Sequence, residues 1–166
     1  MASIGILSQG MPTLRAARDA DSDGIIALIA ACYEEYPPNV LDVDLEEPEL
    51  RTPATSFDAF WVLEKDQQIV GCIALGVLES GKRIELKKCY VSNRLRGGGW
   101  GRRLIETVEA WAAERAIPEV ELWSDTRMTL AHKVYAKLGY IPSGHTRDLH
   151  DISETTEFHF LKHLAL

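Results

Sequence analysis

A change in hydrophobic period near residue 92 constrains the fold of this 166-residue chain more than any other feature. Residues 83–91 alternate between apolar and polar side chains, which is the pattern of a half-buried strand. From Gly101 onward, apolar side chains recur every three or four residues, which predicts an amphipathic helix. A short loop rich in glycine and arginine joins the two, so the chain must pass directly from a strand into the first turn of a helix.

This loop has the composition of an anion-binding site. Glycine permits a close approach of the backbone, the first turn of a helix leaves N–H groups unpaired, and arginine adds charge-assisted hydrogen bonds. Residues 87–103 contain no acidic side chain, although the whole protein has a formal charge of −7. The basic residues of this stretch are Lys87, Lys88, Arg94, Arg96, Arg102 and Arg103. We therefore expect the loop to bind a phosphate or pyrophosphate.

Two common phosphate-binding patterns do not fit the spacing. The dinucleotide fingerprint G-x-G-x-x-G needs a glycine three residues after the second one, and no pair among Gly97, Gly99 and Gly101 meets this condition. The P-loop needs Gly-Lys-Ser/Thr, which is absent from the sequence. NAD and ATP are therefore disfavoured as ligands of the loop.

The stretch Arg96-Gly97-Gly98-Gly99-Trp100-Gly101 resembles the R/Q-x-x-G-x-G/A signature of the GNAT N-acetyltransferases, which also lies between a strand and a helix. A second stretch resembles the family's motif B, and it holds Ala131, Tyr135, Gly139 and Tyr140. The similarity in element order extends over residues 14–164. A phosphate-binding domain unrelated to CoA would leave the second motif unexplained.

The resemblance implies that acetyl-CoA is the cosubstrate. The backbone at Cys89, Tyr90 and Val91 would contact the pantetheine arm, and the loop would surround the pyrophosphate with its main-chain amides. The loop residues given this role are Arg96, Gly97, Gly98, Gly99, Trp100, Gly101 and Arg102. Met128 stands where many members of the family carry an asparagine that contacts CoA.

Acetyl transfer requires a neutral amine, a positioned thioester and a proton for the departing thiolate. The resemblance makes Tyr135 the general acid, while the alternative is an ordinary core tyrosine on an amphipathic helix. Glu85 lies where family members often place the base that accepts the proton of the amine. Its alternative role is that of a solvent-facing strand residue paired with Lys87.

Covalent and metal chemistry are disfavoured by the remaining candidate residues. Cys89 would need a histidine partner to act as an acyl-enzyme nucleophile, and no histidine has a recognisable pairing with it. The histidines near the C-terminus lack the spacing of metal ligands, so we predict no metal. These histidines are His145, His150, His159 and His163.

The predicted fold is α/β (α+β), with a GNAT-like mixed and mostly antiparallel central sheet of about six or seven strands and helices on both faces. We expect an N-terminal extension over residues 1–12 and a single N-acetyltransferase domain over 13–166. A helix should begin at Asp21-Ser22-Asp23 with an N-cap and end before Pro37, and 39–56 should be a loop with a helical turn at most. The strands are expected at 14–17, 59–63, 68–78, 83–91, 120–124 and 155–164, and the later helices at 101–117 and 130–138.

Composition limits the partners. With 46% hydrophobic residues the chain can form one core, and its pI near 5.2 argues against general binding to nucleic acid or to anionic membranes. Three cysteines without a Cys-x-x-Cys pair fit a reducing compartment, and no leader or membrane span is evident, so we expect a cytoplasmic protein. The acidic run at 42–49 suits a cationic acceptor or simply faces water, and a homodimer is compatible with the sequence.

Two functions of different classes remain after the sequence is read. The first is an N-acetyltransferase that moves an acetyl group from acetyl-CoA to a primary amine of a small molecule or peptide, by direct transfer in a ternary complex. The second is a non-catalytic acyl-CoA-binding sensor or interaction module that keeps the loop. A tyrosine at position 135 favours the enzyme, and nothing in the loop identifies the amine.

Overall fold

A computed structural model describes residues 10–166, so residues 1–9 of the expected N-terminal extension lie outside the described part of the chain. Seven strands form one sheet in the order β1-β2-β3-β4-β5-β7-β6. All neighbouring strands are antiparallel except β4 and β5, which run parallel. The strands are β1 (Thr13–Ala16), β2 (Ala59–Lys65), β3 (Gln68–Leu78), β4 (Arg83–Val91), β5 (Glu119–Asp125), β6 (Ile141–Asp148) and β7 (Thr156–His163).

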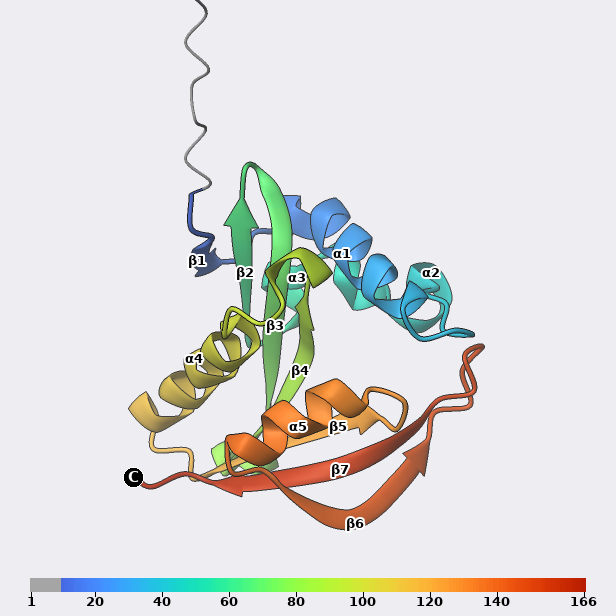
Figure 1. The fold of residues 1–166 in the computed structure, drawn as a ribbon. Helices are drawn as coiled ribbons and strands as arrows, with labels where there is room; N and C mark the ends of the chain where they lie inside the picture. The colour runs from blue at the N-terminus through green and yellow to red at the C-terminus, as the bar shows by residue number, and fades with distance from the viewer. Residues whose placement is uncertain (1–9) are drawn as a thin grey trace, which may run out of the picture.

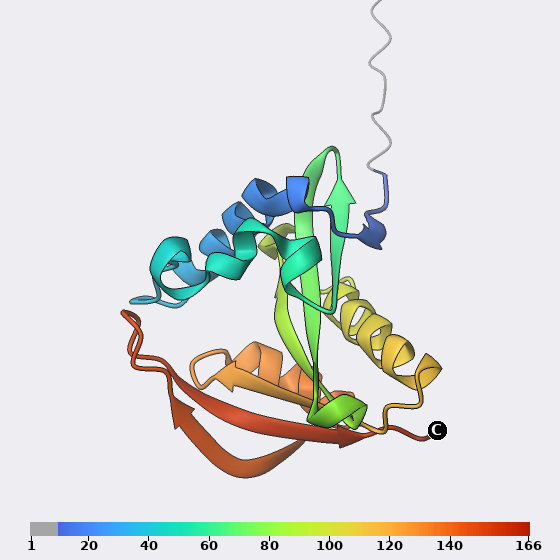
Figure 2. The ribbon, with the colours of Figure 1, turned by 180° about the vertical axis from the view of Figure 1, so that it is seen from behind.

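Helices cover both faces of this sheet (Figures 1 and 2). The α-helices are α1 (Ser22–Glu34), α2 (Val43–Glu46), α3 (Pro53–Ser56), α4 (Trp100–Glu114) and α5 (Thr129–Lys137), and 3-10 turns occupy Asp19–Asp21, Pro48–Arg51, Glu79–Gly81 and Asn93–Leu95. None of the helices within residues 10–166 combines the length and the apolar character needed to cross a bilayer. The mixed sheet with helices on both sides confirms the predicted fold class.

Two separate apolar layers hold the helices to the sheet. On one face, α4 inserts Leu104, Ile105 and Val108 against the sheet, all of them almost fully buried. On the other face, α1 packs Ile25 and Ile29 in a second buried cluster. Because successive side chains of a strand point to opposite faces, β2, β3 and β4 contribute to both clusters.

The start of α1 differs in detail from the predicted N-cap. Asp21 takes the N-cap position, but its carboxylate makes no capping hydrogen bond to the helix. It instead accepts two hydrogen bonds of 2.8 Å from the guanidinium of Arg15 and one from the backbone N–H of Arg18. The bonds from Arg15 lower the pKa of the Asp21 carboxyl to about 2. The acid therefore ties α1 to strand β1, which the local sequence does not reveal.

Two segments needed tertiary contacts to acquire their structure. No residue range was predicted for strand β6, because Pro142 and Gly144 weaken its β-propensity and all its residues are exposed. It forms by pairing with β7 at the edge of the sheet. Residues 39–56, which were expected to form a loop with a helical turn at most, contain α2, α3 and a 3-10 turn. Leu50 of the 3-10 turn is completely buried in the cluster that contains α1.

Strands β4 and β5 pair over only part of their length. Their register runs from Arg83 opposite Glu119 to Leu86 opposite Leu122 and then stops. Beyond that point β4 contains a bulge, in which Lys88 has a φ of +53° and Lys88 and Cys89 together oppose one residue of β3. The two strands then diverge, β4 running upward and β5 to the right in Figure 1.

Gly71 of β3 offers a test of how closely the sheet packs. A Cβ at this position would lie 2.6 Å from Cδ1 of Leu63, inside the buried core. We expect Gly71→Ala to lower the free energy of unfolding by about 1–3 kcal/mol, as overpacking does in a dense core. On the same strand, a Cβ at Gly76 would meet nothing closer than 4.0 Å.

Gly76→Ala is therefore the matched control, and it should change the unfolding free energy by less than about 0.5 kcal/mol. Urea denaturation of both variants measures the difference. Equal effects of the two substitutions would contradict the close packing at Gly71.

Candidate active site

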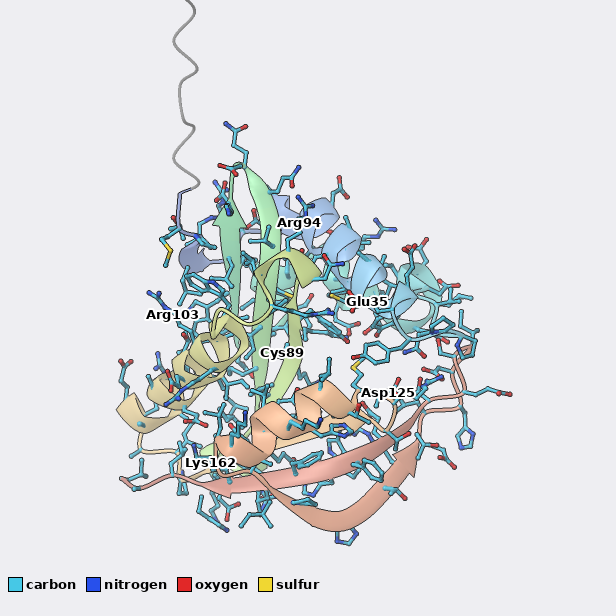
Figure 3. The ribbon with its side chains drawn as sticks, viewed as in Figure 1. Glu35, Cys89, Arg94, Arg103, Asp125 and Lys162 are labelled. Carbon is cyan, nitrogen blue, oxygen red and sulfur yellow. The ribbon has the colours of Figure 1, made fainter. Side chains whose placement is uncertain are left out.

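A cavity of about 210 Å³ lies where β4 and β5 diverge, and it reaches residues from both faces of the sheet. Cys89 and Tyr135 belong to the face that packs against α4 and α5. Glu85 neighbours the inward-facing Leu86 on β4 and therefore points to the opposite face. The gap between the strands thus connects the two sides of the sheet, and Figure 3 shows Cys89 and Asp125 near this gap.

The glycine-rich loop ends in a helix start with free amides. Gly97 and Gly99 adopt φ values of +81° and +77°, which only glycine adopts readily. The first hydrogen bond of α4 runs from the N–H of Arg103 to the carbonyl of Gly99. The N–H groups of Trp100, Gly101 and Arg102 therefore have no partner within the helix and carry its positive dipole.

The arginine side chains of the loop are less available than their number suggests. Arg96 forms two hydrogen bonds to the carboxylate of Glu35 at the end of α1, and Arg102 donates a 2.7 Å bond to Glu106 one turn along α4. Arg94 and Arg103 lie on either side of the loop (Figure 3). The main-chain amides at the start of α4 are therefore more available to an anion than the paired guanidinium groups of Arg96 and Arg102.

Tyr135 projects from α5 into the cavity and is also part of the core. It is 6% exposed, and its ring packs against Tyr140 and Phe160 at centroid distances of 6.0 and 5.7 Å. Burial raises the pKa of its phenol well above the ordinary value, and a hydrogen-bonding interaction with the side chain of Ser124 opposes this rise. The phenol thus stays protonated at neutral pH and can donate a proton or a hydrogen bond into the cavity.

Cys89 lines the same cavity, but its thiol does not suit covalent catalysis. Burial raises the pKa of Cys89 to about 12, so the thiol is protonated at neutral pH. A protonated thiol is a weak nucleophile. The sequence disfavours an acyl-enzyme mechanism for a different reason, the lack of a histidine partner for Cys89.

Two carboxylates share an arginine in the cavity. Glu85 lies 3.7 Å from Nζ of Lys87 and 3.8 Å from Nη2 of Arg147, so the predicted pairing with Lys87 and a place in the cavity occur together. Glu157 of β7 accepts a 2.8 Å hydrogen bond from Nε of the same Arg147, whose guanidinium also lies 4.3 Å from the centroid of Trp123.

Glu157 and Arg147 were missed by the sequence analysis. They meet because β6 and β7 pair with Arg147 directly opposite Glu157, and β6 itself carried no strand signal. Burial raises the pKa of the Glu157 carboxyl, Arg147 lowers it, and the charge of Glu85 raises it again. No local pattern could have shown that Glu157 is the second carboxylate beside Glu85.

One end of the cavity is closed by contacts between distant segments. Ser153 on the β6–β7 connection exchanges hydrogen bonds with the backbone of Val40. Beside it, Nδ2 of Asn39 donates to Asp125, while Oδ1 of Asn39 is buried without a partner. Burial acts to raise the pKa of Asp125, but hydrogen bonds from Arg127 and Asn39 outweigh it and lower this pKa. Asp125 is therefore a buried, ionised carboxylate whose oxygens are already hydrogen-bonded to Asn39 and Arg127.

The acidic run at 42–49 serves mainly local contacts. Asp42 caps α2, Asp44 pairs with Arg51, and Glu46 accepts the backbone N–H of Ile152. Of the acidic residues 42–49, Glu47 alone lines the cavity, where it is paired with Lys88 and accepts a hydrogen bond from the hydroxyl of Tyr33. The run therefore contributes one carboxylate to the cavity rather than an acidic surface.

Two of the four C-terminal histidines lie beside a carboxylate. His159 is buried between Glu121 and the hydroxyl of Ser143, and His163 lies 3.2 Å from Glu119. Across residues 10–166, no three side chains of His, Cys, Asp or Glu converge in a way that could hold a metal ion.

Comparison with known proteins identifies the relatives of this chain. The model of a family described as "Acetyltransferase (GNAT) family" matches residues 24–140. The N-acetylaspartate synthetase of Danio rerio is 29% identical over 113 residues, which are 68% of this chain and 40% of that protein. The chain thus spans less than half the length of this relative. The IAA acetyltransferase of Azospirillum brasilense is 27% identical over 143 residues, which cover 81% of this chain and 88% of that protein.

The fold has close counterparts among solved structures. An acetyltransferase of the GNAT family from Staphylococcus aureus Mu50 superposes with a TM-score of 0.79, at 20% identity. The superposition covers 93% of this chain and 99% of that one. At this level of identity the likeness concerns the fold.

The shared arginine predicts a specific response of Glu157. NMR titration should give a pKa of the Glu157 carboxyl above its ordinary value of 4.5, and Arg147→Gln should raise it further by removing the favourable charge. Since folding raises this pKa, the contribution of Glu157 to stability should fall as the pH rises from 4.5 through the raised value.

Arg83→Gln serves as the control, because Arg83 pairs with Glu119 and Glu121 rather than with Glu157. It should leave the pKa of Glu157 unchanged. A fall of this pKa in Arg147→Gln would contradict the proposed geometry.

Proposed function

The chain belongs to the acetyltransferase (GNAT) family, and from this premise we propose that it transfers an acetyl group from acetyl-CoA directly to a primary amine of a small molecule or peptide. The observation that carries the proposal is the cavity between β4 and β5, since it connects the face that carries Tyr135 with the face that carries Glu85. A donor entering from one face and an acceptor from the other would meet in a ternary complex without a covalent enzyme intermediate.

The donor side has a backbone suited to CoA. The free amides at the start of α4 would hold the pyrophosphate, as helix starts do for anions. The register of β4 with β5 ends at Leu86, so the backbone of Cys89, Tyr90 and Val91 on that edge can pair with the amides of the pantetheine arm. The thioester would then lie near Cys89 and Tyr135, which both line the cavity.

The cavity has a group for each proton transfer, one on each side of the gap. Attack of the neutral amine on the thioester carbonyl breaks the C–S bond, and the departing thiolate needs a proton or a strong hydrogen bond. We assign this role to the phenol of Tyr135. Glu85 would accept the proton of the amine, with Arg147 and Glu157 holding it in place. A reducing compartment such as the cytoplasm suits the three free cysteines.

A panel of amines tests this proposal against a non-catalytic acyl-CoA sensor. The panel contains spermidine, benzylamine, L-aspartate, L-lysine and short peptides with a free N-terminus, each mixed with acetyl-CoA and the protein. An enzyme releases CoA thiol with at least one of them, whereas a sensor binds acetyl-CoA in calorimetry and releases none. Preference for NAD over acetyl-CoA in the same calorimetry would overturn both readings.

Tyr135→Phe tests the general acid with the best acceptor of that panel. Removing the hydroxyl should lower kcat by about 100-fold or more, which is the usual range for general acid catalysis. The Kd for acetyl-CoA should stay within about twofold, because the ring and its packing remain. Unchanged turnover would show that Tyr135 is a core residue only.

Gly99→Ala tests the backbone of the loop. Gly99 has a φ of +77°, and a Cβ at this position would meet only open space, so the substitution acts through the backbone alone. We expect the Kd for acetyl-CoA to rise about tenfold, equivalent to about 1.4 kcal/mol. Gly144→Ala is the matched control, since Gly144 has a φ of +87°, equally open space and a place on β6 far along the chain.

Both substitutions should lower stability by a similar amount, of about 1–2 kcal/mol, because each forces an alanine into the left-handed region. Only Gly99→Ala should weaken acetyl-CoA binding. An equal loss of affinity in both variants would mean that the loop backbone is not the pyrophosphate site.

A further inference from the structure

A lysine of the protein itself lies at the place where an acceptor amine is needed. Lys87 of β4 lines the cavity, and its Nζ is 3.7 Å from Oε2 of Glu85, the proposed base. Glu85 and Lys87 flank the buried Leu86 and therefore both point to the opposite face of the strand. A primary amine of this chain thus already lies beside the group that would accept a proton from an acceptor.

The strand register fixes the position of Lys87 on β4. Pairing between β4 and β5 ends at Leu86, so Lys87 is the first residue of β4 beyond that pairing. On its other side Lys87 still pairs with Ala74 of β3, directly before the bulge at Lys88 and Cys89. The side chain of Lys87 therefore starts from a well-held strand residue at the point where the gap between the strands opens.

The neighbouring Lys88 also lines the cavity, but its amine is held in ion pairs. Its Nζ is paired with the carboxylate of Glu47 and lies 3.4 Å from that of Glu49, and only 13% of its side chain is exposed. The side chain of Lys87 is 40% exposed, and its contact with Glu85 is longer than a hydrogen bond. Lys87 is therefore the freer of the two amines at the gap.

The acetyl donor would lie in the same cavity as this amine. In the proposed function the thioester lies near Cys89 and Tyr135, and both residues line the cavity together with Lys87. Cys89 belongs to the opposite face, because the bulge adds a residue between it and Lys87. A lysine side chain is a flexible four-carbon stem, so its Nζ can turn from Glu85 into the gap and approach the donor.

We propose that Lys87 is an acceptor for the protein's own acetyl transfer, so that its Nζ becomes acetylated from acetyl-CoA within one molecule when no free amine occupies the cavity. This rests on the proposed function, in which Glu85 is the base and Tyr135 is the acid. The product is an acetyl-lysine that has lost its positive charge and lies where the free amine would otherwise bind.

The transfer balances in protons and electrons. The ammonium of Lys87 first gives one proton to solvent, and the neutral Nζ then attacks the carbonyl carbon of the thioester. A C–N bond forms, the C–S bond breaks, and the electron pair of that bond goes to sulfur. Glu85 takes the second proton from the nitrogen, and the sulfur takes the proton of the Tyr135 phenol. Glu85 then gives a proton to solvent and Tyr135 takes one back. One ammonium and one thioester thus give one amide, one CoA thiol and one proton.

The first test needs no free amine. The protein is incubated with acetyl-CoA that carries a deuterated acetyl group, which separates new acetyl groups from any added in the expression host. Tandem mass spectrometry assigns each labelled lysine. Lys87 should be labelled at least about tenfold faster than Lys82, Lys133 and Lys137, as expected of a positioned amine. These three lysines are exposed, so simple chemical acetylation would favour them. Equal or slower labelling of Lys87 would overturn the proposal.

Variants of the cavity give a second test. Lys87→Arg keeps a positive charge beside Glu85 but offers no lysine amine, so the fast labelling should disappear. Lys88→Arg is the matched control and should keep the fast labelling of Lys87, because the amine of Lys88 is held by Glu47. Tyr135→Phe and Glu85→Gln should each slow the labelling of Lys87 by about tenfold or more, within the range of proton-transfer effects. Labelling that ignores both substitutions would be solution chemistry and not transfer by the site.

Transfer within one molecule has a kinetic signature. With saturating acetyl-CoA, the first-order rate constant for labelling of Lys87 should not change with the concentration of the protein. In a mixture, the unaltered protein should not speed up the labelling of Lys87 in Tyr135→Phe, which a tag of different mass keeps distinguishable. A rate constant that rises with protein concentration would mean transfer between molecules and would contradict the proposal.

A free amine should compete with Lys87. The best acceptor of the panel, added at saturating concentration, should slow the labelling of Lys87, because both amines need the same place beside Glu85. Labelling that continues at the original rate would place Lys87 outside the acceptor position.

Failure of this inference and failure of the proposed function give different results. If the protein releases CoA with free amines but Lys87 stays unlabelled, only the inference is wrong. If Lys87 is labelled quickly but no free amine releases CoA, the proposed transfer to free amines is wrong and the internal transfer stands. A protein that binds acetyl-CoA, labels no lysine selectively and releases no CoA is a sensor, and both proposals are then wrong.

Discussion

The early end of pairing between β4 and β5 is the constraint on which the rest of the site depends. Strand pairing stops at Leu86 and Leu122, and the bulge at Lys88 and Cys89 then turns β4 away from its neighbour. If β4 and β5 paired along their whole length, no opening would connect the two faces of the sheet. The divergence leaves a backbone edge without a strand partner and a cavity that reaches both faces, which the proposed ternary complex requires.

Charge in this molecule is arranged in local pairs rather than in broad patches. Arg96 is paired with Glu35 and Arg102 with Glu106, so the proposed binding of a pyrophosphate relies on the backbone amides at the start of α4. In the cavity, Arg147 lies between Glu85 and Glu157. Such pairing lowers the desolvation cost of burying carboxylates, and Arg147 lowers the pKa of Glu157 against the effect of burial.

The candidate site was predictable in part. The strand, the glycine loop and the helix follow from local period and composition, and the structure places Tyr135 and Glu85 on one cavity. Glu157, Arg147 and Ser124 carried no signal, because a Glu, an Arg or a Ser on a strand is ordinary until its cross-strand neighbours are known.

The sequence by itself determined the central strand, the loop and the two later helices, and through two motifs it indicated the GNAT family, since these features depend on residues close together in the chain. Only the tertiary structure decided where β6 pairs, that Asp21 binds Arg15 instead of capping α1, and which carboxylates meet at Arg147. The physical reason is how far apart in the sequence the interacting residues lie. Backbone geometry and hydrophobic period are set within a few residues, whereas ion pairs, buried hydrogen bonds and the shape of a cavity depend on strand register and helix packing across the whole sheet.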